Sequence, residues 1–309
     1  MNAGRQLAFA DSGAKADAYT WLRALRVHQW VKNGLIFAPL FAAHRAGSWA
    51  GLADGTLAFA AFSCCASALY LFNDILDVND DRLHARKRFR PLASGRLSRS
   101  QAVLAALSLL SAAAILTMLL PPPFAGVLAA YVSLSAFYSL HLKKLAVVDV
   151  IVLALLYATR LIAGAAADDI VPSFWLLAFA TFFFLSLAIL KRYAELRTKT
   201  AGAMLNGRGY VSDDLPVVLS LGTASGLISV LILAMYTQAP IVPQSYRAGE
   251  WLWLAPVLIL YWITRIWVLA QRGSVDDDPV VFASRDRPSL VVLALLGGVY
   301  VLASVGWRV

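Results

Sequence analysis

The apolar runs in this sequence are longer and more numerous than the core of a soluble domain needs. The chain has 309 residues, of which 60% are hydrophobic and only 15% are charged. A helix requires about 20 apolar residues to cross the hydrocarbon core of a bilayer. Divided by that length and by the polar residues between the runs, the sequence predicts an all-α, polytopic membrane protein.

Nine membrane spans are expected from these runs. The first is the weakest, because Pro39 interrupts it and it barely reaches the usual length, so a tilted, kinked or partly re-entrant course is expected there. Residues 21–309 then form a single transmembrane domain, preceded by a loose cytoplasmic tail of residues 1–20 that lacks the apolar core of a signal peptide. The nine spans cover residues 33–46, 57–76, 101–120, 124–142, 146–166, 172–191, 215–236, 251–271 and 288–307.

The basic residues are distributed unevenly between the two sides of the membrane. Most of the 27 Lys and Arg fall in the amino-terminal segment and in the loops after spans 2, 4, 6 and 8. Short loops rich in Lys and Arg stay cytoplasmic, which predicts a cytoplasmic amino terminus and an external carboxyl terminus in the inner (plasma) membrane of a prokaryote. This bias, together with attraction to anionic membrane lipid, accounts for the net charge of +9 without a nucleic-acid partner.

The end of the second span carries a dense charged stretch, "NDILDVNDDRLHARKRFRPLASG", residues 73–95. If the helix continues, Asn73, Asp77 and Asp81 stand at i, i+4 and i+8, and Asp74 completes a patch about 100° wide. Carboxylates this close repel one another unless a cation neutralises them. Mg²⁺ prefers one or two carboxylates, waters and substrate phosphate oxygens, so these four residues are predicted metal ligands, with Mn²⁺ as the alternative ion.

Basic residues follow this acidic patch. Lys87, Arg88 and Arg90 supply hydrogen-bond donors for phosphate, and the two arginines can do so bidentately. The alternative is a solvated charge run beside the membrane, in which the two signs pair with each other. The one-face spacing of the acids and the turn signal from Pro91 to Gly95 favour a Mg²⁺ and diphosphate site facing the cytoplasm.

The fifth span contains Asp149 and Arg160, eleven residues apart and nearly on one face of a helix. An arginine inside a membrane is costly, so Arg160 is expected to face the interior of the bundle or a wet cavity. Two interpretations stay open for Arg160: it lines a substrate cavity, or it is a structural partner for a buried polar group or a helix end. Asp149, at the cytoplasmic end, is the stronger functional candidate.

A third acidic stretch, "DDDP" at residues 276–279, is weaker evidence for a site. It lacks helical spacing because Pro279 breaks the helix, so a solvated acidic loop is favoured over a second metal patch.

The pattern NDxxDxxxD, followed by a basic stretch and RPxxSG, resembles the first aspartate-rich motif of the UbiA superfamily of intramembrane prenyltransferases. That resemblance implies nine helices around a central cavity. "YSLHLKK", residues 138–144, is similar to the Tyr and Lys element that the family carries in the loop after its fourth helix, which adds Tyr138 and Lys143 to the candidate residues.

One departure from the family pattern lies in the loop after the sixth span. Members that transfer a prenyl group carry a second aspartate-rich motif there, where a second Mg²⁺ sits. This chain has "LKRYAELRTK", so that Lys191 and Arg192 fall where acids are expected and only Glu195 remains. The loop is therefore expected to bind anionic oxygen rather than a second metal.

This variant pattern is similar to the decaprenyl-phosphate phosphoribosyltransferase branch of the superfamily. The similar segments are "HQWVKN" (28–33), "VVDV" to "ATRLIAG" (147–164), "LKRYAEL" (190–196), "GRGY" (207–210) and "DDDPVVFASRDR" (276–287). The resemblance implies Mg²⁺-dependent transfer of phosphoribosyl from phosphoribosyl diphosphate (5-phosphoribosyl 1-diphosphate) to a polyprenyl phosphate, with decaprenyl phosphate as the branch's acceptor. The product would feed arabinose donor synthesis for the cell envelope.

The resemblance assigns roles to residues of this chain. Catalytic roles go to Asp74, Asp77, Asp81, Asp149 and Lys191. Substrate-binding roles go to Lys32, Asn33, Lys87, Arg88, Arg90, Tyr138, Lys143, Arg160, Glu195, Arg208 and Tyr210.

Two other functions remain open from the sequence. A prenyltransferase with an aromatic acceptor would share the first aspartate motif, although its second motif is missing here. A transporter of lipid phosphate would place its binding groups near the midplane, which only Arg160 does. The oligomeric state is open as well, a homo-oligomer included.

Overall fold

The protein is a bundle of long helices. The computed structural model describes residues 17–45, 47–83, 87–200, 202–205, 207–275 and 278–306. Within them there is no β-sheet, which agrees with the all-α prediction. Eight helical segments are long and apolar enough to cross a membrane: α3 (Trp49–Leu76), α5 (Arg99–Thr117), α6 (Pro122–Leu140), α7 (Val148–Ala167), α8 (Phe174–Arg197), η4 with α9 (Ser212–Thr237), η5 with α11 (Gly249–Gln271) and α13 (Arg287–Val305).

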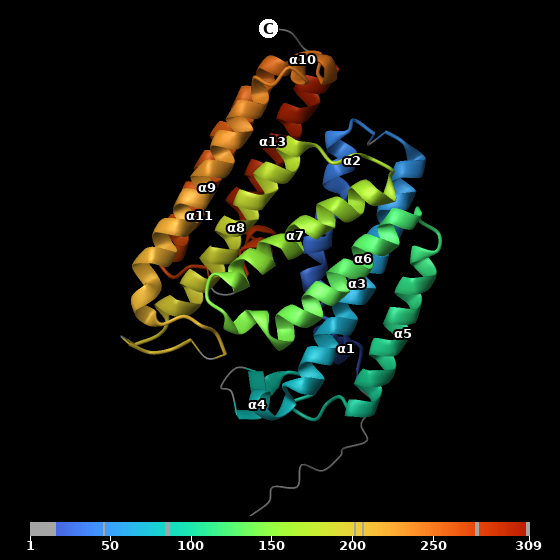
Figure 1. The fold of residues 1–309 in the computed structure, drawn as a ribbon, viewed down its shortest axis with the longest axis vertical. Coiled ribbons are helices and arrows are strands. Elements are labelled where there is room, and N and C mark those ends of the chain that lie inside the picture. The colour runs from blue at the N-terminus through green and yellow to red at the C-terminus, as the bar shows by residue number, and fades with distance from the viewer. Residues whose placement is uncertain are drawn as a thin grey trace, which may run out of the picture.

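The other helical elements of the described residues are shorter, and among them α1, α4 and α10 lie at the two ends of the bundle (Figure 1). The end that carries α1 and α4, here named the α4 end, lies opposite the end that carries α10. Of the expected tail of residues 1–20, residues 1–16 lie outside the described residues, and α1 begins at Ala18. The short elements are α1 (Ala18–Ala24), η1 (Val27–Phe37), α2 (Ala38–Ala42), α4 (Val78–Leu83), η2 (Lys87–Phe89), η3 (Leu142–Lys144), α10 (Val242–Ser245) and α12 (Pro279–Ala283).

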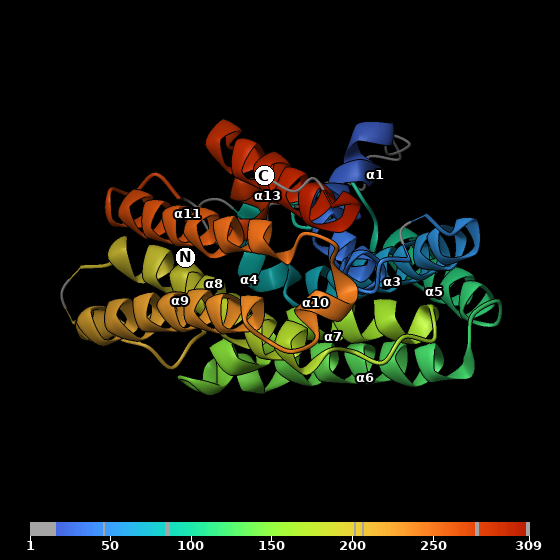
Figure 2. The same cartoon turned by 90° about the horizontal axis from the view of Figure 1, so that it is seen from above.

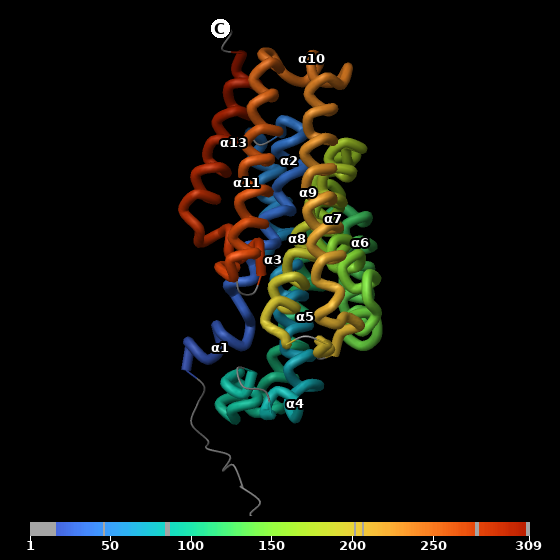
Figure 3. The backbone as a smooth tube through the Cα atoms, turned by 90° about the vertical axis from the view of Figure 1, so that its left-hand side faces the viewer, coloured from blue at the N-terminus to red at the C-terminus, as the bar shows by residue number. Residues whose placement is uncertain are grey.

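The expected first span, residues 33–46, differs most from its prediction. In place of one long α-helix, the chain forms the 3₁₀ helix η1 and the five-residue helix α2. A 3₁₀ helix rises about 2.0 Å per residue, so η1 and α2 together extend about 30 Å, close to the thickness of a bilayer core. Figure 3 shows this segment running from α1 toward the end that carries α10. The interruption expected at Pro39 is therefore a change of helix type.

Two glycines let η1 lie unusually close to its neighbours. A Cβ atom on Gly164 of α7 would lie 1.8 Å from the carbonyl oxygen of Ile36, and one on Gly55 of α3 would lie 2.9 Å from the ring of Phe37. Inside a bilayer, helices associate through close van der Waals packing more than through the hydrophobic effect, and small residues permit it. The glycines of α3 and α7 therefore form the surface against which η1 packs.

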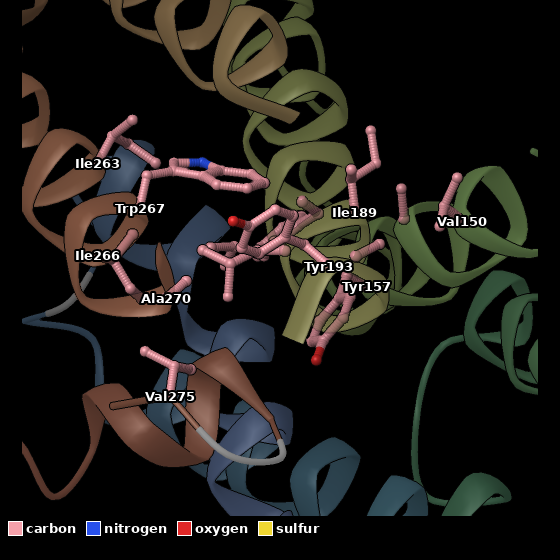
Figure 4. Close-up of a cluster of buried hydrophobic side chains, with 14 of the residues drawn as sticks. Val150, Tyr157, Ile189, Tyr193, Ile263, Ile266, Trp267, Ala270 and Val275 are labelled. Carbon is pink, nitrogen blue, oxygen red and sulfur yellow. The ribbon is translucent and has the colours of Figure 1, made fainter. Parts of the chain in front are cut away.

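Helix α7 connects two packed clusters of buried side chains. One cluster joins α7 with α8, α9 and α11, and Figure 4 shows its aromatic members Tyr157, Tyr193 and Trp267. The other joins α3, α6 and α7, and it includes Phe62 and the buried Cys65. Seen from above, α6 and α7 lie on one side of the bundle and α11 and α13 on the other (Figure 2). A shift in α7 would therefore disturb both halves.

Replacing Gly164 with Ala tests the close packing of η1 against α7. The new Cβ would collide with a backbone oxygen that cannot turn away, so we expect a loss of about 1–3 kcal/mol or more in the free energy of unfolding. The readout is the thermal midpoint of the detergent-purified protein. Gly126→Ala in α6 is the control, because nothing lies within 4 Å of its Cβ. Equal midpoints for the two variants would contradict the proposed packing.

Candidate active site

A cavity of about 290 Å³ opens at the α4 end, between η1, α3, α6, α7 and α8. Among the described residues, its walls carry eight basic side chains and two carboxylates. Such an excess of positive charge attracts and holds polyanions. The basic residues are Arg26, Lys32, Lys87, Arg90, Lys143, Arg160, Lys191 and Arg208, and the acids are Asp77 and Asp278.

The aspartate motif lies where α3 ends and α4 begins. Asp77 ends α3, yet the backbone N–H of Asp77 still donates to Asn73 at 2.9 Å, and that of Asp81 to Asp77 at 2.8 Å. The helical spacing is thereby kept across the break. Asn73 and Asp77 line the cavity, whereas Asp74 and Asp81 are buried, each with 2% of its surface exposed.

The two buried aspartates hold arginines. Arg90 donates to Asp81 at 2.7 Å and to Asp74 at 3.2 Å, and Arg26 donates to Asp74 at 2.5 Å. No three His, Cys, Asp or Glu side chains within the described residues come together as a metal site. The sequence predicts four metal ligands on one face, but it does not predict that Arg26 and Arg90 pair with two of them. A metal-binding role for Asp74 or Asp81 stays a prediction, and it requires Arg90 to move.

The side-chain oxygens of Asn73 and Asp77, the two motif residues that line the cavity, are suitable ligands for Mg²⁺. The side chain of Asp77 is 40% exposed, and in the described part of the chain its ion-pair partner is Lys143, at the long distance of 4.0 Å. Asn73 uses its amide nitrogen to donate to Ser139 at 3.2 Å, which leaves its carbonyl oxygen for another partner. One carboxylate and one amide oxygen, completed by water and substrate phosphate, form a set that Mg²⁺ accepts.

A third buried acid, Asp149, links α8 and the loop after it to the start of α7. Its carboxylate accepts from Arg192 at 2.5 Å and from the Tyr210 hydroxyl at 2.9 Å. Burial and the neighbouring Asp149 raise the pKa of Tyr210, so that its hydroxyl keeps the proton it donates. Gly209 permits this contact, because a Cβ there would lie 2.6 Å from the carbonyl oxygen of Lys144. The "GRGY" segment is thus held against the start of α7 through Tyr210.

Arg192 is a buried structural cation rather than a wall of the cavity. It is fully buried, donates to Glu195 at 2.6 Å and donates to the hydroxyl of Tyr138 at 3.1 Å. Arg208 donates to the same hydroxyl at 2.7 Å and lies 3.7 Å from Asp149. Arg192, which stands where the family's second aspartate-rich motif is expected, therefore binds Asp149 and Tyr138. These two residues lie next to Arg208, which does line the cavity.

Arg160 lies both at the cavity and among buried polar partners, so the structure agrees with elements of both interpretations that the sequence leaves open. It lines the cavity, and it also donates to Asn33 at 2.9 Å and to the hydroxyl of Tyr131 at 3.3 Å. Asn33 in turn donates to Ser63 of α3 at 3.0 Å. Arg160 therefore ties η1 to α7 while presenting charge to the deep part of the cavity.

Asp278 corrects the interpretation of the "DDDP" stretch as a solvated loop. Its side chain is only 6% exposed, accepts from Lys32 at 2.5 Å and lies 3.6 Å from Lys191. Asp276 and Asp277 lie outside the described residues. The buried position has a local reason, since Asp278 caps α12 and Pro279 is the first residue of that helix, a common N-terminal pattern. The Asp-Pro pair could have indicated this helix start.

Four predicted substrate-binding residues do not line the cavity. Asn33 is buried between Ser63 and Arg160, and Arg88 is exposed and lies over the ring of Phe89. Glu195 contacts Arg192, and Tyr210 contacts Asp149, both behind the cavity wall.

Several cavity residues were not among the candidates, including Arg26 and Tyr157. Only the folded chain brings them to the site.

Removing the buried charge of Arg192 should destabilise the protein. Arg192→Met would leave Asp149 buried with an unpaired charge, at a cost of about 3–5 kcal/mol in the free energy of unfolding. Arg265→Met is the matched control, because its ion pair with Asp286 is more exposed and should contribute no more than about 1 kcal/mol. Thermal midpoints of the two purified variants measure the difference, and a smaller loss for Arg192→Met would refute this role.

Relatives of known name cover most of this chain. It is 38% identical over 286 residues to the uncharacterized protein y4nM of Sinorhizobium fredii, a match that covers 92% of this chain and 55% of that protein. It is 36% identical to the nodulation protein NoeC of Azorhizobium caulinodans, covering 91% and 92%. It is 31% identical to the decaprenyl-phosphate phosphoribosyltransferase of Mycolicibacterium smegmatis, covering 89% and 90%.

The fold has a solved counterpart. A UbiA homolog from Archaeoglobus fulgidus, solved with DMAPP and Mg²⁺, superposes with a TM-score of 0.68 at 17% identity and covers 92% of this chain and 98% of that one. Residues 34–287 match the model of the UbiA prenyltransferase family. With that match over most of its length and with a bundle of apolar helices around a cation-rich cavity, the chain belongs to the UbiA prenyltransferase family of membrane transferases.

Proposed function

We propose that the protein transfers the 5-phosphoribosyl group from phosphoribosyl diphosphate to a polyprenyl phosphate and releases diphosphate, with Mg²⁺. The observation that carries the proposal is the charge of the cavity, with eight basic side chains against two acids. The relatives named decaprenyl-phosphate phosphoribosyltransferase support the same donor and acceptor, with decaprenyl phosphate as one form of the acceptor.

The number of anionic groups in the reaction agrees with that excess. The donor carries a diphosphate and a separate 5-phosphate, and the acceptor carries a third phosphate. The cations stand on different walls, which suits several separated anions: Arg90 after α4, Lys143 after α6, Lys191 on α8 and Arg160 deep on α7. An allylic diphosphate presents a single anionic group and would leave much of this charge unmatched.

The leaving group is handled by the aspartate motif. Asn73 and Asp77 would hold Mg²⁺, and the bound ion would neutralise the departing diphosphate. Arg90 is held in the wall by Asp74 and Asp81 and can donate two hydrogen bonds to the same diphosphate. Because positive charge develops at the ribose carbon as the bond breaks, these fixed charges on the leaving group should supply most of the rate.

The acceptor needs positioning more than it needs a base. A phosphate is already anionic at neutral pH, so no strong proton acceptor is required at the cavity. Arg160 donates to the hydroxyl of Tyr131 in the cavity wall, and Lys32 lies over the ring of Tyr157. The excess of Lys and Arg in the loops of the α4 end supports an inner-membrane location with the cavity facing the cytoplasm.

The second candidate is prenyl transfer from an allylic diphosphate to an aromatic acceptor. The solved fold relative that binds DMAPP and Mg²⁺ favours it. The basic Lys191 and Arg192, standing where prenyl-transferring members of the family have acids, count against it.

Product mass separates the two candidates. Purified protein and Mg²⁺ would be mixed with a polyprenyl phosphate and phosphoribosyl diphosphate, or, in a second mixture, with an aromatic acceptor and an allylic diphosphate. We expect a new lipid whose mass exceeds that of the acceptor by one phosphoribosyl unit, in the first mixture only. A product that forms with the allylic donor and an aromatic acceptor, but not with phosphoribosyl diphosphate, would replace this proposal with the second candidate.

Asp77→Ala tests the metal role most cleanly, because Asp77 is partly exposed and its loss breaks no buried pair. We expect turnover to fall at least about 100-fold, since fixed charge on the leaving group is lost, with an unchanged thermal midpoint. Asp80→Ala is the control, because Asp80 is its exposed neighbour in α4. Full activity of Asp77→Ala, or of the wild type in excess EDTA, would contradict the metal role.

A further inference from the structure

Two lysines that line the cavity share one carboxylate. Lys32 comes from η1 and Lys191 from α8, while Asp278 comes from the segment between α11 and α13. Tyr157 of α7 donates to the other oxygen of Asp278 at 3.4 Å, and Lys32 lies over its ring at 5.6 Å. Figure 4 shows the hydroxyl of Tyr157 pointing away from the packed cluster. Asp278 therefore joins three separate parts of the cavity wall.

The two lysines are held unequally. Lys32 donates to Asp278 at 2.5 Å and its side chain is 10% exposed, whereas Lys191 lies at 3.6 Å with 31% of its side chain exposed. A distance of 3.6 Å exceeds that of a hydrogen bond, so Lys191 is attracted by the carboxylate without being bound to it. Lys191 can therefore turn toward another anion at little cost, while Lys32 stays with Asp278.

The carboxylate also favours the charged form of Lys32, because it opposes the lowering of the Lys32 pKa by burial. Burial and a neighbouring like charge both favour the neutral amine, and a nearby carboxylate opposes both effects. Burial alone would raise the pKa of Asp278, but the ammonium groups of Lys32 and Lys191 outweigh it and hold that pKa below its ordinary value. Asp278 is thus an anion throughout the neutral range.

We propose that Asp278 is a positioning residue: it holds Lys32 and Lys191 at the cavity until a phosphate group of the substrate takes its place as partner of Lys191. This inference deepens the proposed function, and it requires only that the substrate bears phosphate. It predicts that the carboxylate matters most at alkaline pH, where Lys32, buried and without its partner, loses its proton first.

Other charged groups act on Lys32 and are unchanged in the test. The charged and titratable groups near it are Arg26 and His28 from the amino-terminal segment, Tyr157 and Arg160 from α7, and Asp278. Since the others are cationic or neutral, Asp278 is the acid among these groups that favours the charged form of Lys32.

Inorganic sulfate is a suitable probe, because it remains a dianion from pH 6 to pH 9. The experiment measures sulfate affinity by titration of the thermal midpoint without Mg²⁺, for wild type and Asp278→Asn. Asparagine caps a helix as well as aspartate does, so α12 should be kept. We expect the affinity of the variant to fall at least about tenfold between pH 6 and pH 9, as its buried Lys32 loses its proton, and that of the wild type to change less than about threefold.

Two matched variants sharpen the result. Asp286→Asn removes an acid that caps α13 and pairs with Arg265 away from the cavity, and it should follow the wild type at every pH. Asp278→Glu restores the charge and should restore the flat profile. A flat profile for Asp278→Asn would overturn the proposal, and so would a steep one for Asp286→Asn.

Lys191→Met keeps the test decisive if Asp278→Asn fails to fold. It retains the buried pair between Lys32 and Asp278, so the thermal midpoint should hold while sulfate affinity is lost at both pH values. Wild-type sulfate affinity in this variant would overturn the proposal. Because sulfate binding needs no donor or acceptor, this result is independent of the product masses that test the proposed function.

Discussion

Buried carboxylates that each hold a basic side chain are the interaction on which the site depends. A charge removed from water without a partner is strongly destabilising, so a cation-rich cavity at the end of an apolar bundle needs fixed acids behind its walls. Asp74 and Asp81 hold Arg90, Asp149 holds Arg192, and Asp278 holds Lys32. The acids neutralise the structural cations, and the excess charge is left for the cavity.

The long helices could be predicted from the sequence because a bilayer imposes one length on every span. The form of the first span could not, because the segment packs closely against Gly164 and Gly55, which belong to other helices. The spacing of Asn73 and Asp77 correctly placed them on one face at the cavity. Arg26 escaped notice because an ion pair across 48 residues leaves no local pattern. For the same reason the sequence did not predict that Asp149 pairs with Arg192, which lies 43 residues away on another helix.

The relation to the fold relative separates scaffold from chemistry. At 17% identity the bundle is retained, while the charges at its α4 end are free to differ. In this chain a basic pair, Lys191 and Arg192, takes the place of the expected acids. One of the two faces the cavity, and the other joins Asp149 inside the wall. A fold can therefore keep its shape while the charges of its site change.

The pair between Lys32 and Asp278 also constrains how the chain is made. Its partners are separated by 246 residues, so the ribosome delivers the lysine long before the carboxylate that will neutralise it. During insertion, the first segment must keep that ammonium near the membrane surface, where water is available. Only when the last two helices enter the bilayer can the lysine settle into its final place. A truncated chain lacking them would thus be left with an incomplete cavity as well as two missing helices.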